Sequence, residues 1–481
     1  MIRHQAALVL AAILLGGCSL APKHVRPPMP VPVAWTVADR DTADAARPAD
    51  WRQFFLAPAL QKIIASSLNN NRDLRIAIWR VEVARSQYRG QRAELFPQIN
   101  AGAAGLRDQT PAFLSATGQS STGNLFGGLL DVSWEIDLWG RVRNLNAAAL
   151  DTWLATREAR GAITLSLIAE VANTWLAERE LDERIALARQ TIDSRRESAR
   201  IARRRFEVGA AARIDLTQAE TLLGQAESAL ITLEQQREKT RNALAVLTGM
   251  QSGDETTKLS AVEDAAVMRD LPPGLPSGLL TQRPDIRGAE DRLRATEANI
   301  GAARAAFFPR ISLIGDYGTA STALDSLFAA GSGLWILGGS AVAPVFDGGH
   351  LLGNLAGAKA HRGMAVADYE RTVQAAFRDV ADALAARRWL GLQIETQRRT
   401  LAALNERARL AGERYRTGAA TYLEVLDSQR DLFAAEQALV ETRRFRLSTE
   451  VNLFAALGGG QDDPSESAAS AIIPETNGPA Q

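Results

Sequence analysis

The chain repeats the same landmarks at a nearly constant spacing, and this repetition constrains its fold more than any other feature. Residues 92–97 (RAELFP) resemble residues 304–309 (RAAFFP), which lie 212 positions further along. Such agreement at several places indicates a tandem duplication. Three more matches occur at spacings of 209 or 210 positions: Asp137 and Asn144 with Asp347 and Asn354, residues 205–209 with 414–418, and residues 242–249 with 452–459.

Each half contains a long stretch that predicts a helical hairpin. No proline occurs in residues 112–271 or 345–463, and both stretches are rich in strong helix formers. A continuous helix over residues 140–208 would rise roughly 100 Å. Apolar ladders return after Gly209 and Gly418, so these glycines mark the expected tips of two hairpins.

Apolar residues follow a heptad pattern along both long helices. The steps alternate between four and three positions, and only Arg195 interrupts the first ladder. A sustained heptad predicts helices packed side by side, as in coiled coils. The first ladder is Leu181, Ile185, Ala188, Ile192, Ala199, Ala202 and Phe206, and the second is Leu390, Ile394, Gln397, Leu401, Leu404, Ala408, Ala411 and Tyr415.

Strand patterns lie between the helices of each half. Apolar and polar residues alternate strictly over residues 130–138, which predicts a strand with one apolar face and one acidic face. A soluble sheet edge has the same pattern. However, Asp131, Glu135 and Asp137 suit the wall of a water-filled lumen, with the apolar face toward lipid. The glycine-rich fourth strand does not define its faces.

These patterns predict a mixed fold, a membrane β-barrel combined with long α-helices. Each repeat contains a helix, two strands and a helical hairpin. The helix that begins near Leu60 is expected to end at residues 96–97, because a residue before proline leaves the α region. The strands are expected at about 98–107, 127–139, 310–319 and 334–347. The expected segments are a signal peptide (1–17), a lipidated proline-rich arm (18–59), a first repeat (60–249), a linker (250–283), a second repeat (284–459) and a disordered tail (460–481).

The first residues predict export. Arg3 gives a basic start, and the apolar run that follows is too short to span a bilayer. Residues 15–18 (LGGC) resemble the bacterial lipobox, in which the cysteine is acylated and becomes the first residue of the mature protein. Lipoproteins held at the inner membrane typically carry Asp after this cysteine. Ser19 stands there in this chain, which favours the outer membrane. The alternative is an ordinary signal peptide in which Cys18 is incidental.

Composition and motifs argue against several functional classes. Lys and Arg (55) balance Asp and Glu (55), so no nucleic-acid partner is implied. After Cys18, no window holds the eighteen apolar residues of a membrane helix. The chain has neither the paired histidines of a zinc protease nor a phosphate-binding loop. We therefore expect no enzyme, cofactor or metal site, and an envelope hydrolase is only a weak alternative.

Neither the strands nor the hairpins are sufficient alone. Four strands cannot close a membrane barrel, because about eight is the smallest number seen. A rod that buries only an apolar stripe also needs neighbours. Several copies are therefore expected to share one barrel and one helical tube.

Motifs across the chain, up to about Gly459, resemble those of the TolC-like outer-membrane efflux family, in its lipoprotein (NodT-type) branch. The resemblance implies a homotrimer with a shared twelve-stranded barrel, continuous with a helical periplasmic tunnel. It also implies an exit duct for small molecules, loaded by an inner-membrane pump of the RND type and a periplasmic adaptor. The motifs are Cys18 in its lipobox, residues 50–54 (DWRQF), 71–74 (NRDL), 135–140 (EIDLWG), 282–286 (QRPDI), 308–309 (FP), 346–349 (FDGG), 415–418 (YRTG) and 422–427 (YLEVLD).

The resemblance assigns a periplasmic gate to the hairpin tips. The acids that match Glu424 and Asp427 line the constricted tip in this family, and the two lie on one helix face. Asp215 is the counterpart of Glu424, 209 positions earlier. Tyr415 corresponds to a tyrosine that hydrogen-bonds across the closed tip, so a Tyr415–Asp215 contact is a hypothesis.

Two of the gate residues also have a simpler explanation. Thr421 and Glu424 form a capping-box pattern, in which Glu424 would satisfy the helix start. Tyr415 could pack only as the last rung of its ladder. Some family members carry a gate arginine at the position of Ala420. This chain therefore departs from the family pattern at the gate. The rival to a channel is a non-pore surface lipoprotein with a scaffold or adhesin role, which leaves the amphipathic strands unexplained.

Overall fold

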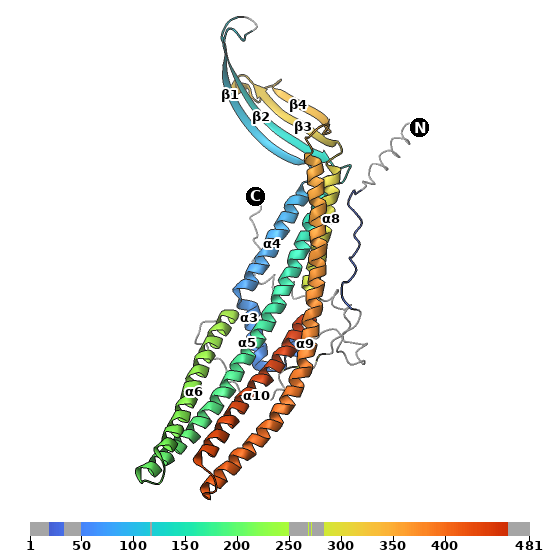
Figure 1. Ribbon diagram of the computed structural model, residues 1–481. Helices are drawn as coiled ribbons and strands as arrows, with labels where there is room; N and C mark the ends of the chain where they lie inside the picture. Colours follow the sequence, from blue (N-terminus) through green and yellow to red (C-terminus); the bar gives the residue numbers. More distant parts are fainter. Residues whose placement is uncertain are drawn as a thin grey trace. The chain divides into compact units, whose positions relative to one another are not determined.

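The computed structural model describes residues 19–32, 50–115, 118–249, 268, 271 and 283–459. This part of the chain is mostly helical and contains one four-stranded sheet (Figure 1). It divides into two compact units. The first comprises residues up to 28, 80–158 and 288–371, and the second comprises residues 29–79, 159–287 and those from 372 onward. The signal peptide, Cys18, most of the linker and the tail lie outside the described residues.

The first unit contains the sheet. Its strands run antiparallel in the order β1-β2-β3-β4, so β1 and β4 form the two edges. A short 3-10 helix, Leu324–Ser326, lies between β3 and β4. The strands are β1 Gln98–Thr110, β2 Ser121–Ile136, β3 Arg310–Ser321 and β4 Gly333–Val342.

The strand register sorts the side chains into two different faces. Residues that pair directly across strands share a face, since side chains alternate along each strand. One face carries the acids together with apolar side chains such as Ile314 and Ile336, and the other is mainly apolar, which supports the alternation predicted for residues 130–138. The first is called the polar face here. Trp335 and Leu337 place the fourth strand in this scheme, because they pair with apolar-face residues of β3. The polar face includes Asn100, Asp131, Ser133, Glu135, Ser312 and Asp316, and the apolar face includes Ile99, Leu130, Val132, Trp134, Leu313, Tyr317, Trp335 and Leu337.

Several strand ends differ from the prediction. The strands expected to reach residues 139 and 347 end at Ile136 and Val342. The physical reason is that Asp137 and Asp347 cap the helices that follow. The Asp137 carboxylate accepts the backbone N–H of Arg143 at 2.8 Å, and the Asp347 carboxylate accepts that of Leu351 at 2.7 Å. At its other end, β2 begins at Ser121, earlier than the expected residue 127.

The predicted helix from Leu60 is interrupted, which corrects the expectation of one element. It consists of α3 Pro58–Asn70 and α4 Arg72–Ala93, after the short α2 Trp51–Phe54. The break lies at Asn71, whose backbone is extended. Its side chain caps α4 by accepting the N–H of Leu74 at 3.0 Å, and it donates to the carbonyl of Leu247 at 3.0 Å. These side-chain bonds compete with a continuous helix.

Two hairpins contain the longest helices (Figure 1). At both tips a glycine adopts the left-handed conformation, with φ of 75° at Gly209 and at Gly418. The following N–H, of Ala210 or Ala419, bonds back to the helix end in the same way. No helix within the described ranges is both long and apolar enough to cross a membrane. The hairpin helices are α5 Arg141–Glu207, α6 Arg213–Thr248, α9 His350–Arg416 and α10 Tyr422–Ala456, and α8 is Pro284–Ala305.

The first heptad ladder is buried as predicted. Leu181, Ile185 and Ala188 of α5 pack with Leu233 of α6, and Phe433 of α10 lies against the same cluster. Aromatic side chains form a second core, in which Phe454 stacks on Phe54 with ring centroids 4.5 Å apart. Tertiary packing of one apolar stripe, rather than intrinsic propensity, stabilises these long helices.

Candidate functional site

The acids predicted for the lumen have different surroundings. Asp131 lies on the polar face of β2, where it accepts a hydrogen bond from Asn100 at 2.7 Å. It stands directly opposite Asp316 of β3. Two carboxylates at opposite positions repel one another unless water screens them. This arrangement therefore suits a hydrated surface.

Glu135 and Asp137 stabilise the junction between β2 and α5 by binding residues at the start of α5. Arg141 donates two hydrogen bonds to Glu135, at 2.8 and 2.7 Å, and Arg310 lies 3.4 Å away. Asp137 was predicted as a strand acid, but it lies one residue beyond β2 and binds the backbone and the guanidinium of Arg143. Its position on the strand was therefore wrong, because the helix start takes its carboxylate.

Aromatic side chains gather near the strand ends. Trp139 stacks on Phe308 with centroids 4.7 Å apart and donates its indole N–H to the carbonyl of Pro309 at 2.9 Å. Trp134 donates to the carbonyl of Leu95 at 3.1 Å. Tryptophan with an apolar ring and a satisfied N–H is typical of a boundary between apolar and wet surroundings.

Tyr415 links two helices at the hairpin tips. Its hydroxyl accepts a hydrogen bond from Arg205 of α5, whose guanidinium also lies 5.1 Å from the centre of the tyrosine ring. The ring of Tyr422 lies 5.0 Å from that of Tyr415. In a single copy the hydroxyl bonds to Arg205 and, among the described residues, makes no bond to Asp215, so the hypothesised Tyr415–Asp215 contact stays a prediction for the assembled tip.

The acids at the tips pair with nearby arginines. Glu424 binds Arg414 at 3.1 Å, and Asp427 binds Arg430 at 3.1 Å. Thr421 is the N-cap of α10 but makes no side-chain capping bond, so the capping box does not hold Glu424. The Asp215 carboxylate has no hydrogen bond or ion pair with any residue in the described ranges. All these side chains are exposed or half-buried, which leaves them available to neighbouring groups.

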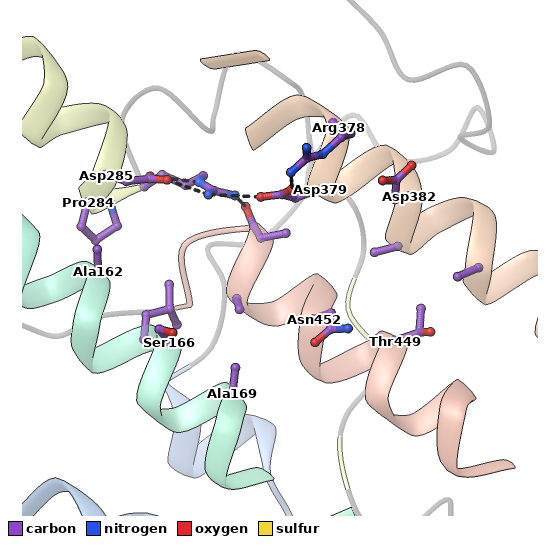
Figure 2. Close-up of a pocket in the computed structure, with 16 residues that line it drawn as sticks. Ala162, Ser166, Ala169, Pro284, Asp285, Arg378, Asp379, Asp382, Thr449 and Asn452 are labelled. Atoms are coloured by element: carbon purple, nitrogen blue, oxygen red, sulfur yellow. Dashed lines mark hydrogen bonds and ion pairs between the residues drawn. The ribbon is translucent and has the colours of Figure 1, made fainter. Parts of the chain in front are cut away.

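The second unit contains a pocket of about 790 Å³ between α5, α8, α9 and α10 (Figure 2). Arg283 closes one side, where it binds Asp285 at 2.7 Å, Asp379 at 3.5 Å and the carbonyl of Ala456 at 2.9 Å. Alanines and other small side chains line much of the remainder. The lining contains no histidine or cysteine, and no group of metal-binding side chains occurs in the described part of the chain. The pocket is therefore best explained as a packing gap where four helices meet, with Arg283 linking three of them.

One polar cluster was not found from the sequence. Residues 19–28 lie alongside α8. There His24 binds Glu297 at 2.8 Å and Glu290 at 3.3 Å, and Arg26 binds Glu290 at 2.8 Å. Burial alone would raise the pKa of Glu290, but hydrogen bonds from Arg26 and His24 hold that pKa below its usual value. No sequence pattern connects groups that are more than 260 positions apart.

An amphipathic sheet whose edge strands pair with no further strand in the described residues, on the same chain as long helical hairpins, is typical of channel-forming outer-membrane proteins. The family model described as outer membrane efflux protein matches residues 63–250 and 275–459. The chain belongs to this family. It is an outer-membrane channel of an efflux system.

Individual relatives agree with this assignment. The toluene efflux pump outer membrane protein TtgC of Pseudomonas putida is 41% identical over 466 residues, which cover 96% of each chain. Outer membrane protein OprJ of Pseudomonas aeruginosa is 41% identical over 457 residues, or 95% of each chain. The open state of the Neisseria gonorrhoeae MtrE outer membrane channel superposes with a TM-score of 0.84 at 35% identity, covering 92% of this chain and 98% of that one.

Proposed function

We propose that three copies of the chain form one duct, in which their sheets close a twelve-stranded barrel and their hairpins form a periplasmic tunnel. The observation that carries this proposal is the sheet itself. Its apolar face is exposed in a single chain, with Trp335 74% and Leu337 78% accessible. Its edges, β1 and β4, have no further strand to pair with among the described residues. Pairing β4 of one copy with β1 of the next satisfies both edges, and closure turns the apolar face toward lipid.

The proposal includes a tandem repeat with boundaries at 60–249 and 284–459. Two observations support it. The family model matches the chain twice, once in each half. The tips at Gly209 and Gly418 also share one φ value and one hydrogen-bonding pattern. Three copies of two similar hairpins would present six quasi-equivalent hairpins around one axis.

The tips are proposed to act as the gate. Glu424, Asp427, Asp215 and Tyr415 lie at or next to the hairpin turns, and three copies would bring rings of these groups together. Closely spaced carboxylates favour cations and repel one another, so they would narrow the passage only while the tips are held together. In the barrel, Asp131 and Glu135 would face the water-filled lumen.

The proposed partners follow from the relatives that are named for efflux pumps. An inner-membrane pump, of the RND type, and a periplasmic adaptor would load the tunnel with small toxic compounds, such as solvents or drugs. Acylation of Cys18 would anchor the N-terminal arm in the outer membrane. We assign no catalytic role or cofactor to the chain, since its proposed work is passage.

Reconstitution of the full chain tests the proposal. The purified protein should run as a heat-sensitive trimer on gels and should conduct ions across planar bilayers. A C18A variant, which cannot be acylated, should still trimerise and conduct, since the barrel alone crosses the lipid. A stable monomer that is released without detergent and conducts no ions would instead support the scaffold alternative.

A further inference from the structure

A pocket of about 150 Å³ lies between α5 and α10, apart from the tip residues discussed above. Ser194 and Arg195 of α5 line one side, and Gln429, Phe433 and Glu436 of α10 line the other. The pocket therefore contains one cationic and one anionic side chain. Neither has an ion-pair partner among the residues that the structure describes.

Arg195 is the more unusual of the two, because it is only 4% exposed. One nitrogen, Nη1, donates to the carbonyl of Leu222 at 2.7 Å, while Nε has no partner. The guanidinium lies 5.3 Å from the ring centre of Phe433. Burial lowers the pKa of Arg195, as expected for a charge removed from water without a counter-ion.

Packing alone does not account for an arginine at this position. Arg195 interrupts the apolar ladder of α5, and Leu404, 209 positions further on, occupies the matching place in the second ladder. An apolar side chain here would avoid the cost of desolvating a charge. The buried guanidinium of Arg195 is therefore expected to bind an anionic partner in another arrangement of the helices.

Glu436 has the complementary properties. It is half-buried, burial raises the pKa of its carboxyl, and no described residue binds that carboxyl. The Oε1 atom of Gln429 beside it is also unpaired. The free edge of Arg195, formed by Nε and Nη2, is the edge of a guanidinium that binds a carboxylate through two parallel hydrogen bonds.

Beyond this pocket, residues 180–184 of α5 and residues 437–444 of α10 are joined by hydrogen bonds and ion pairs. Arg444 binds Glu180 at 2.8 Å, Arg443 binds Glu183 at 2.9 Å, and Arg184 binds Gln437 at 2.8 Å. Glu436 is the next residue of α10 after this series, and Arg195 lies three helical turns beyond Arg184. The step from Gln437 to Glu436 is one residue, whereas the step from Arg184 to Arg195 is eleven, so this pair lies outside the register of the three bonds. Its closure therefore requires α10 to shift against α5.

We propose that Arg195 and Glu436 are a gating pair, which closes in a second arrangement of α10 against α5 and stabilises that arrangement. This inference rests on the proposed function, because it concerns the tips that would open the duct. In the present arrangement the pair is apart while the Arg205–Tyr415 link at the tips is formed. Because α9 and α10 form one hairpin, a shift of α10 against α5 would also move Tyr415 relative to Arg205 and break their link. The Arg195–Glu436 pair is therefore formed when the tips are open.

A double-mutant cycle in reconstituted full-length protein tests the pair. R195L and E436Q should each lower the ratio of open to closed time by about tenfold, as expected for a charge-assisted pair. The double variant should lower it no further, and the exchange R195E/E436R should restore it to within about twofold. The matched control is E197Q/R200Q, which removes an exposed pair of α5, 2.6 Å apart, and should leave gating unchanged.

Additive single effects, or no rescue by the exchange, would overturn the pair. So would a wild-type gate that responds to acetate or chloride while R195L does not, because the pocket would then bind a small anion in place of Glu436. A second readout does not depend on conductance. Oxidation of R195C/E436C should form a disulfide within the protomer, and its absence under conditions that open the tips would count against the proposal. A silent wild-type channel would instead contradict the proposed function.

Discussion

Replacing Tyr415 with phenylalanine should open the proposed gate more often. The change removes the hydroxyl that accepts the hydrogen bond of Arg205 but keeps the ring between that guanidinium and Tyr422. A hydrogen bond to a charged donor at an exposed site contributes about 1 kcal/mol. Its loss should therefore raise the ratio of open to closed time about fivefold. Y415A also loses the ring contacts, about 1 kcal/mol more, and should raise that ratio about thirtyfold.

Single-channel recordings in planar bilayers measure this ratio directly. The matched control is Y422F, because the hydroxyl of Tyr422 faces Ser198 and takes no part in the Arg205–Tyr415 bond, so its loss should change the ratio little. R205Q loses both the hydrogen bond and the contact of the guanidinium with the ring, so its effect should exceed that of Y415F and approach that of Y415A. Adding Y415F to R205Q should change the ratio no further. If Y415F behaves as wild type while D215N opens the channel, the Tyr415–Arg205 link is not the latch, and the aspartate is the partner in the assembled gate.

Three further outcomes follow from the structure. E424A/D427A should raise single-channel conductance, and unchanged conductance would remove both acids from the gate. G249A should lower the apparent melting temperature more than G209A. Both positions share the left-handed strain of about 1–2 kcal/mol, but only at Gly249 would a Cβ lie 2.7 Å from a backbone oxygen, that of Asn70; equal melting temperatures would contradict this reasoning. Burial, assisted by Asp291, raises the pKa of Asp151 from 3.8 to about 6. The folded chain therefore holds this proton longer than the unfolded chain, and stability falls as pH rises from about 4 to about 6. D151N should flatten the melting temperature across that window, and an unaltered slope would show that Asp151 does not titrate there.

The long-range pattern of the fold could be predicted because it depends on periodicity. The ladder of α5 and the turns at Gly209 and Gly418 were placed correctly, since an apolar stripe has one way to be buried and a left-handed helix end favours glycine. The alternation around Trp134 likewise separated the two faces of β2. These features are properties of consecutive residues, so the sequence carries them directly.

Features that depend on distant groups could not be predicted. The break at Asn71 depends on the carbonyl of Leu247, 176 positions away. Asp137 satisfied the strand alternation, but the backbone of α5 competed for its carboxylate and ended the strand earlier. Glu290 resembles any helical acid until His24 and Arg26 of the N-terminal arm lie beside it. Pairings of this kind are set by tertiary structure.

The two heptad ladders make the strongest physical case for assembly. Their sequence patterns are alike, but the ladder of α5 is largely buried within one chain and that of α9 is not. On α5, six of the seven rungs are buried, covered by α6 and by Phe433 of α10. Of the eight rungs on α9, only Ile394 and Ala411 are buried, and Leu401 and Leu404 remain half-exposed. Keeping an apolar stripe partly in water loses roughly 25 cal/mol for each Å² left uncovered. A second copy that covers the ladder of α9 would recover this free energy, just as its β1 would complete the edge at β4. The helices and the sheet thus need the same neighbour, and one interface can satisfy both.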